Sequence, residues 1–191
     1  YTPDAFELLF LRCPNTLVLA DNSRLVQSSK VLEVELDKNS TFTVIGYLTF
    51  HECRSLRKVN IPASVRTIKS INDNHGRAFN YCVSLETLTF DEGSQLTEIQ
   101  GGAFNGCDSL REIQLPASMV TINNNTLSYC DGLRIVRLPE NFTHFVNLNG
   151  ETIRTDHHSF TYDSDNIKEY YLPVTFYATM PATKYQVFQL A

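Results

Sequence analysis

A short pattern centred on cysteine returns four times in this chain of 191 residues, and it constrains the fold more than any other feature. Each copy has leucine three residues after the cysteine and apolar residues six and eight positions after it, so it reads C-x-x-L-x-x-Φ-x-Φ, where Φ is apolar. Successive copies are separated by 29, 25 and 23 residues. The repeated cysteines are Cys53, Cys82, Cys107 and Cys130. A chain that repeats one unit in this way folds as stacked coils, because a single unit cannot bury its own apolar side.

The second half of each copy predicts a short strand with one face turned inward. Apolar residues occupy alternate positions there, as Val59 and Ile61 do in the first copy. Proline follows the strand in three copies and turns the chain away from the sheet, because it cannot donate to the ladder. The step Ala-Phe-x-x-Cys before the strand predicts a short helical or 3-10 turn with phenylalanine inward. We therefore expect a leucine-rich-repeat solenoid, with a parallel β-sheet on one face and short helical or 3-10 turns and short strands on the other.

Equivalent residues of successive coils are expected to form columns in the core. The leucines of the pattern form one column and the four cysteines another, so the repetition of cysteine indicates packing. An enzyme needs a nucleophilic cysteine only once, and zinc sites usually use close pairs such as C-x-x-C, which this sequence lacks. His157 and His158, beside Asp156, are assigned to a solvated loop. The sequence therefore predicts no catalytic residue, no metal site and no cofactor.

Charge and hydropathy narrow the classes of partner. The formal net charge is -5 and the pI is about 5.5, which leaves no broad cationic face for nucleic acid. No apolar run approaches the roughly 20 residues that span a bilayer, so no membrane insertion is expected in this window.

The repeat resembles that of the BspA-like, or Treponema pallidum type, leucine-rich repeat family. The pattern of that family is approximately A-F-x-x-C-x-x-L-x-x-I-x-L-P-x-S-V-x-x-I, and residues 103–122 follow it almost position for position. Proteins with these repeats are typically surface-exposed or secreted, and several are linked to adhesion. The resemblance therefore implies an extracellular or cell-surface location.

Three parts of the chain are distinguished. Residues 1–27 are predicted to form an N-terminal cap with a short helix over residues 3–12, since Thr2 and Pro3 resemble a helix start. Residues 28–173 are predicted to form a solenoid of about six repeats. Residues 174–191 are aromatic and β-prone, and they are predicted to form a C-terminal cap or a degenerate repeat.

The outward side of the strands is the predicted partner-binding surface, because solenoids bind along surfaces built from several repeats. Its candidate residues are Arg57, Lys58, Arg111, Glu112, Arg134, Arg137 and Tyr171. A competing interpretation is that alternating charges, such as Glu86 between arginines of the neighbouring copies, only keep the surface soluble.

The sequence thus favours a non-catalytic binding module of a surface or secreted protein, acting in adhesion or protein–protein interaction. A host, matrix or cell-surface protein is the expected partner, and a glycan is the alternative partner. Two other functions stay open. One alternative is a structural spacer within a longer surface protein. The other is a fragment of an enzyme whose site lies in the insertions at 69–77 or 146–166.

Overall fold

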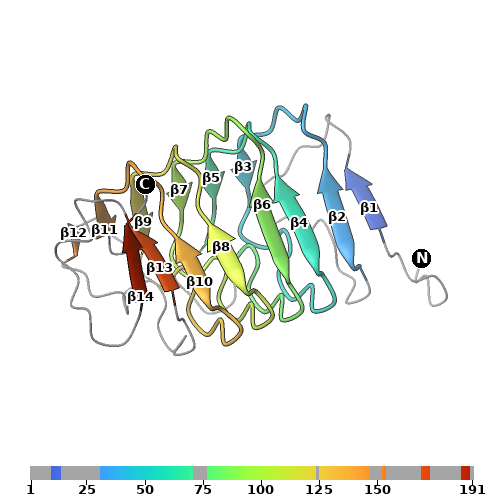
Figure 1. Cartoon of the computed structure of the whole chain (residues 1–191). Helices are drawn as coiled ribbons and strands as arrows, with labels where there is room; N and C mark the ends of the chain where they lie inside the picture. Colours follow the sequence, from blue (N-terminus) through green and yellow to red (C-terminus); the bar gives the residue numbers. More distant parts are fainter. Residues whose placement is uncertain are drawn as a thin grey trace, which may run out of the picture.

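The chain is a stack of coils in which a row of parallel strands lies along one side (Figure 1). The computed structural model describes residues 10–13, 31–70, 77–123, 125–146, 152–153, 169–172 and 186–189. The strands of this front row are β1 (Phe10–Cys13), β2 (Glu33–Leu36), β4 (Lys58–Ile61), β6 (Thr87–Phe90), β8 (Glu112–Gln114), β10 (Ile135–Arg137), β13 (Glu169–Leu172) and β14 (Gln186–Gln189). Parallel ladders join these strands into two sheets, one in the order β1-β2-β4-β6 and the other in the order β8-β10-β13-β14. No ladder joins β6 to β8 among the described residues.

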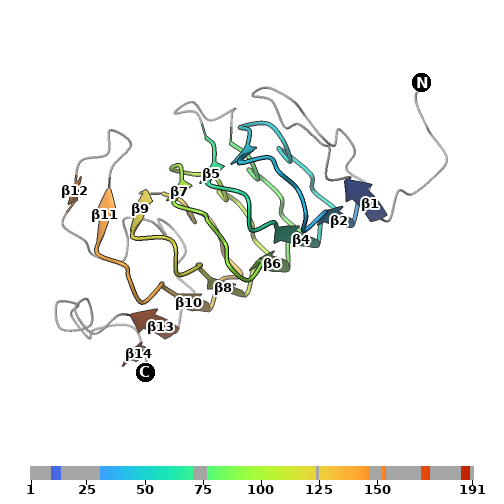
Figure 2. The ribbon, with the colours of Figure 1, turned by 90° about the horizontal axis from the view of Figure 1, so that it is seen from above.

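A second row of shorter strands lies on the other side of the coils (Figure 2). Its members are β3 (Val44–Ile45), β5 (Thr67–Ile68), β7 (Glu98–Ile99), β9 (Thr121–Asn123), β11 (His144–Val146) and β12 (Thr152–Ile153). The pairings between these strands are parallel except that of β11 with β12, and an isolated bridge between Ser70 and Arg77 is also antiparallel. The predicted solenoid with a parallel sheet on one face and short strands on the other is confirmed.

The core consists of columns of equivalent residues, as the repeat predicts. Strand register places Val59 beside Val34 and Leu88, and Ile113 beside Val136. The leucines at positions 56, 85, 110 and 133 and the cysteines at 53, 82, 107 and 130 are all buried. Because alternate residues of each strand point inward, each coil covers the apolar side of the next.

The phenylalanines before the cysteines stack from coil to coil. The ring centroids of Phe50 and Phe79 are 4.8 Å apart, and those of Phe79 and Phe104 are 4.9 Å apart. Interplanar angles of 20° and 18° make these stacked pairs. Their separation equals the usual spacing of hydrogen-bonded neighbouring strands, about 4.7–4.9 Å. Between Phe79 and Phe104, whose coils share no strand ladder among the described residues, the bond from the Phe79 amide to the Ala103 carbonyl at 2.9 Å sets this distance.

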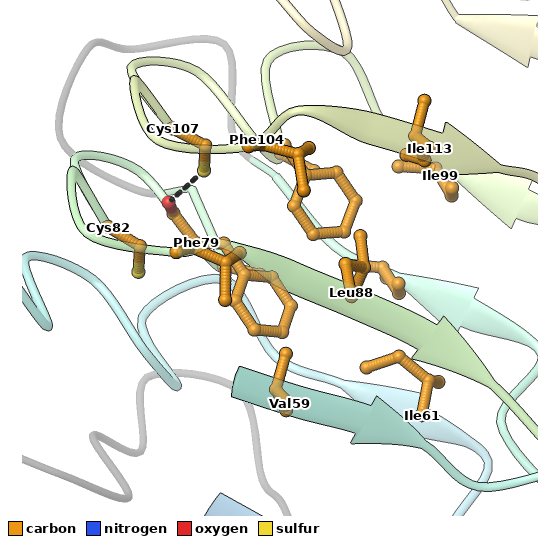
Figure 3. Close-up of a cluster of buried hydrophobic side chains, with 14 of the residues drawn as sticks. Val59, Ile61, Phe79, Cys82, Leu88, Ile99, Phe104, Cys107 and Ile113 are labelled. Atoms are coloured by element: carbon orange, nitrogen blue, oxygen red, sulfur yellow. Dashed lines mark hydrogen bonds between the residues drawn. The ribbon is translucent and has the colours of Figure 1, made fainter. Parts of the chain in front are cut away.

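Three of the four repeated cysteines donate a thiol hydrogen bond to the preceding coil, and Figure 3 shows the bond of Cys107. The Sγ of Cys82 donates to the carbonyl oxygen of Phe50 at 3.1 Å, and Cys107 donates to the carbonyl of Phe79 at 3.4 Å. Cys130 donates to the carbonyl of Phe104 at 3.3 Å. Cysteine suits the position because it is small and apolar and still carries a weak donor. Burial is the main cause that raises the pKa of Cys82 and of Cys107.

The turn before each strand is built from single hydrogen-bonded turns, and no helix occurs in the described ranges. The amide of Cys53 bonds the carbonyl of Phe50 at 3.2 Å, which is the i to i+3 bond of a 3-10 turn. The residue directly before each repeated cysteine prevents the turn from continuing as a helix, because its backbone is left-handed in every described copy. These residues are Glu52, Tyr81, Gly106 and Tyr129, with φ of 57°, 58°, 71° and 57°.

The predicted N-terminal helix over residues 3–12 is wrong at residues 10–12, which form a strand. They belong to strand β1, whose Leu11 lies beside Val34 of β2. Pairing with the otherwise open edge of β2 satisfies backbone groups that a helix would leave exposed there. Residues 3–9 lie outside the described residues. At the other end β14 pairs in parallel with β13, which is the arrangement of a further repeat strand.

The buried thiols are expected to resist modification in the native protein. Cys53, Cys82, Cys107 and Cys130 should react with an alkylating reagent only after denaturation, because they are buried and carry no disulfide. The check is mass spectrometry of the chain alkylated with and without denaturant. Rapid native labelling at any of the four, or a mass showing two disulfides, would contradict the packing described here. Cys13 is not covered by this prediction.

Column residues and outward residues are expected to differ sharply in their contribution to stability. Leu110 is fully buried, so replacing it by alanine should lower the free energy of unfolding by about 2–5 kcal/mol through a cavity between coils. Arg111, its exposed neighbour, is the matched control, and alanine there should cost within about 0.5 kcal/mol. Urea denaturation of the two variants measures the difference. Equal losses would show that the inward and outward assignments are mistaken.

Candidate functional site

The outward side of the front strands is an open surface formed by alternate residues of successive repeats. In β4 and β8 the central residue is buried, and the residues on either side of it are exposed or half-buried. All seven candidate residues lie on this surface or at its lower edge in Figure 1, where the chain enters each strand. They divide into a cluster on β8, β10 and β13 and a separate pair on β4.

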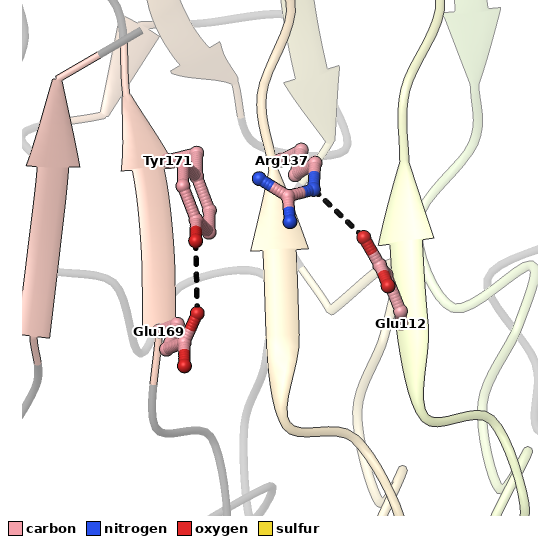
Figure 4. A network of polar contacts seen from close by, with 4 residues as sticks. All are labelled: Glu112, Arg137, Glu169 and Tyr171. Carbon is pink, nitrogen blue, oxygen red and sulfur yellow. Dashed lines mark hydrogen bonds and ion pairs between the residues drawn. The ribbon is translucent and has the colours of Figure 1, made fainter.

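The cluster on β8, β10 and β13 is centred on Arg137 (Figure 4). Its Nε lies 2.7 Å from Oε1 of Glu112, and its guanidinium carbon lies 3.6 Å from the centroid of the Tyr171 ring. The Tyr171 hydroxyl donates to Oε2 of Glu169 at 3.0 Å. The bond to Glu112 is the main cause that raises the pKa of Arg137, so the guanidinium stays charged. Arg137 is thus held between an acidic and an aromatic neighbour, and its side chain is only 28% exposed.

Arg134 and Arg111 bind the turn that leads into β10. Arg134 donates to the carbonyl oxygens of Asp131 at 2.8 Å and Leu133 at 3.0 Å. Arg111 donates to the carbonyl oxygen of Gly132 at 3.4 Å. Both guanidinium groups therefore already have acceptors within the chain, Arg134 at shorter distances than Arg111.

Arg57 and Lys58 form the separate pair, at the start of β4. Both are exposed, and their side chains make no hydrogen bond or ion pair within the part of the chain that the structure describes. The predicted alternation of charges likewise produces no ion pair between Glu86 and either Arg57 or Arg111 in the described ranges. Among the described side chains, this surface is therefore not a ladder of salt bridges, and its cations without a partner are Arg57 and Lys58 at the start of β4.

The turns before the strands form a cleft, which is a second candidate site that the sequence analysis did not identify. The cleft has a volume of about 420 Å³. The lining residues are Arg77, Asn80, Tyr81, Asn105, Asn125, Ser128 and Tyr129. Asparagine and tyrosine at the two variable positions of A-F-x-x-C were the available signal.

The described residues bear on the predictions about metal sites, membrane insertion and the insertion at 146–166. Among the described ranges, no three His, Cys, Asp or Glu side chains are grouped so that they could hold a metal ion. No helix in those ranges is long and apolar enough to cross a membrane. His157 and His158 lie outside the described residues, as does most of the insertion at 146–166.

Solved structures with the same architecture include two leucine-rich repeat proteins. One is the T. pallidum leucine-rich repeat protein, with a TM-score of 0.55 and 24% identity over 89% of this chain. The other is a leucine-rich cell surface protein of Faecalibacterium prausnitzii, with a TM-score of 0.60 and 21% identity over 95% of this chain. This chain covers 61% of the first protein and 43% of the second. No curated protein matches the chain.

The model of the BspA type leucine-rich repeat region matches residues 21–148 in six copies. That region contains every repeated cysteine and the strands from β2 to β11. A match over more than half of the chain, on coils stacked in the register that the repeat requires, shows that this chain belongs to the BspA-type leucine-rich repeat family.

Proposed function

We propose that this chain is a non-catalytic binding module of a surface or secreted protein, and that it contacts another protein through the exposed strand face. The family supports a repeat scaffold that presents a surface, and a similar structure is that of a cell surface protein. The face offers side chains from consecutive coils on one continuous surface, as protein recognition requires. Adhesion to a host, matrix or cell-surface protein is the role that follows.

The observation that carries the proposal is the state of the cations on this face. Arg134, Arg137 and Arg111 already hold partners within the chain, whereas Arg57 and Lys58 are exposed and uncommitted. A partner therefore gains new ion pairs at β4 without breaking existing ones. We place the centre of the contact there, opposite acidic residues of the partner, with Arg137 and Tyr171 as a pre-ordered edge.

Reversing both free charges should weaken adhesion without unfolding the chain. For Arg57→Glu combined with Lys58→Glu, we expect affinity for a bound matrix protein to fall by about tenfold or more, and to lose its sensitivity to salt. The measurement is surface plasmon resonance against a panel of purified matrix proteins, beside a thermal melting curve. Arg66→Glu is compared with Arg57→Glu alone as the charge-matched control, because Arg66 is exposed just before β5 on the other side of the coil.

Unchanged affinity for a ligand that the native chain binds would remove the strand face as the contact surface. An equal loss in the Arg66 variant would show that net charge, and not this face, governs binding. Absence of binding by the native chain to the whole panel would favour the spacer function.

Arg137 is expected to contribute to stability where Arg57 does not. Arg137→Ala removes an ion pair and the contact with the Tyr171 ring, so the free energy of unfolding should fall by about 1 kcal/mol. Arg57→Ala should change it by less than about 0.5 kcal/mol. Urea denaturation of both variants checks this. Raising the salt concentration should reduce the difference between their losses in the free energy of unfolding, because salt screens the ion pair. A larger loss at Arg57 would contradict the division of roles on this face.

A further inference from the structure

The cleft at the turns is framed by two exposed tyrosines from coils that are not adjacent. Tyr81 and Tyr129 occupy the same position of the repeat and are 45% and 47% exposed. Gly106 holds that position in the coil between them. At a coil spacing of about 4.8 Å the two backbones lie about 10 Å apart, and the middle coil has no side chain at this position of the repeat.

Gly106 is present because of space and not only because of its backbone angle. The position has positive φ in all four described copies, and Glu52, Tyr81 and Tyr129 adopt it with a side chain. A Cβ added at Gly106 would lie 2.8 Å from Cδ1 of Tyr81, which is too close for a real contact. The Tyr81 ring therefore leans over Gly106, and this placement keeps the cleft open and lined by an aromatic face.

The floor of the cleft carries buried polar atoms that have no partner. Asn80 is 1% exposed and Ser128 is 2% exposed, and neither Oδ1 of Asn80 nor Oγ of Ser128 makes a hydrogen bond. Burying such a group without a hydrogen bond costs free energy, and nearly all buried polar groups in proteins are paired. Both residues line the cleft, so a molecule bound there that reaches these two atoms would supply the missing bonds.

The chemistry of the lining selects the class of ligand. Two tyrosine rings offer apolar faces, while three asparagines, Ser128 and Arg77 offer donors and acceptors, and no carboxylate lines the cleft. The volume of about 420 Å³ is within the range of small-molecule sites, about 300–1,000 Å³. A sugar ring has this combination, since its C–H faces pack on aromatic rings and its hydroxyls meet amides at the edges.

We propose that this cleft binds a neutral sugar residue of a glycan, with a face of the ring against a tyrosine and its hydroxyls bonded to Asn80 and Ser128. The site is on the turns and does not use the strand face. It therefore goes beyond the proposed protein contact, and each of the two can fail without the other.

The test is saturation-transfer NMR of the whole chain with methyl hexosides, N-acetylhexosamines and glucuronic acid at millimolar concentration, with glycerol as the polyol control. We expect at least one neutral sugar to bind with a Kd near or below about 1 mM. Tyr129→Ala should weaken this binding by about tenfold. Glu52→Ala should leave it unchanged, because Glu52 has the same repeat position and backbone conformation but lies outside the cleft.

Ser128→Ala provides a second variant with a different signature. It should weaken sugar binding while leaving the melting temperature equal or higher, because it removes a buried hydroxyl that has no partner. The proposal is overturned if no sugar binds the native chain, which would mean that only water fills the cleft. It is also overturned if glucuronic acid alone binds, which would indicate an anion site at Arg77, or if Glu52→Ala weakens binding as much as Tyr129→Ala.

Discussion

The distance between neighbouring coils is the constraint on which the rest of the structure depends. Backbone ladders fix it within each of the two front sheets. Between β6 and β8, which no ladder joins among the described residues, bonds at the turns fix it, and there the amide of Tyr81 donates to the carbonyl of Asn105 at 2.9 Å. The centroids of Phe79 and Phe104 are consequently held 4.9 Å apart, and the cysteine thiols are within reach of the preceding phenylalanine carbonyl. One repeat distance thus accommodates backbone bonds, aromatic stacking and thiol donors together.

This shared spacing explains why cysteine recurs at the same position of the repeat. The phenylalanine carbonyl accepts from the amide of the cysteine in its own coil, as between Cys53 and Phe50 at 3.2 Å, and from the thiol of the next coil. Serine in that column would bury a stronger hydrogen-bonding group among apolar neighbours, and alanine would leave the carbonyl with a single donor. A raised pKa at Cys82 and Cys107 keeps the thiols protonated and therefore able to donate.

The columns could be predicted from the sequence because inward residues keep the same spacing within each copy of the repeat, whereas the surfaces depend on details that this spacing does not contain. Strand β1 also had a signal, since Leu11, Cys13 and Pro14 repeat the Φ-x-Φ-Pro step, but the apolar run before it resembles a helix. The diagonal contact of Arg137 with Glu112 depends on side-chain conformation, since register places Gln114 beside Arg137. Its contact with Tyr171 further requires that the chain return to the sheet after the insertion.

The same constraint separates the parts of a repeat that maintain the fold from those that are free to differ between coils. Outward strand positions and the left-handed turn position make little core contact, so a residue there changes the surface without moving the ladders. At the turn, Glu52, Tyr81, Gly106 and Tyr129 share one backbone conformation with four very different surfaces. A single glycine between two tyrosines is then enough to open a cleft, because the neighbouring coils hold their positions. Recognition in such a solenoid is therefore set by which side chains occupy equivalent positions in consecutive coils, on a backbone that stays the same.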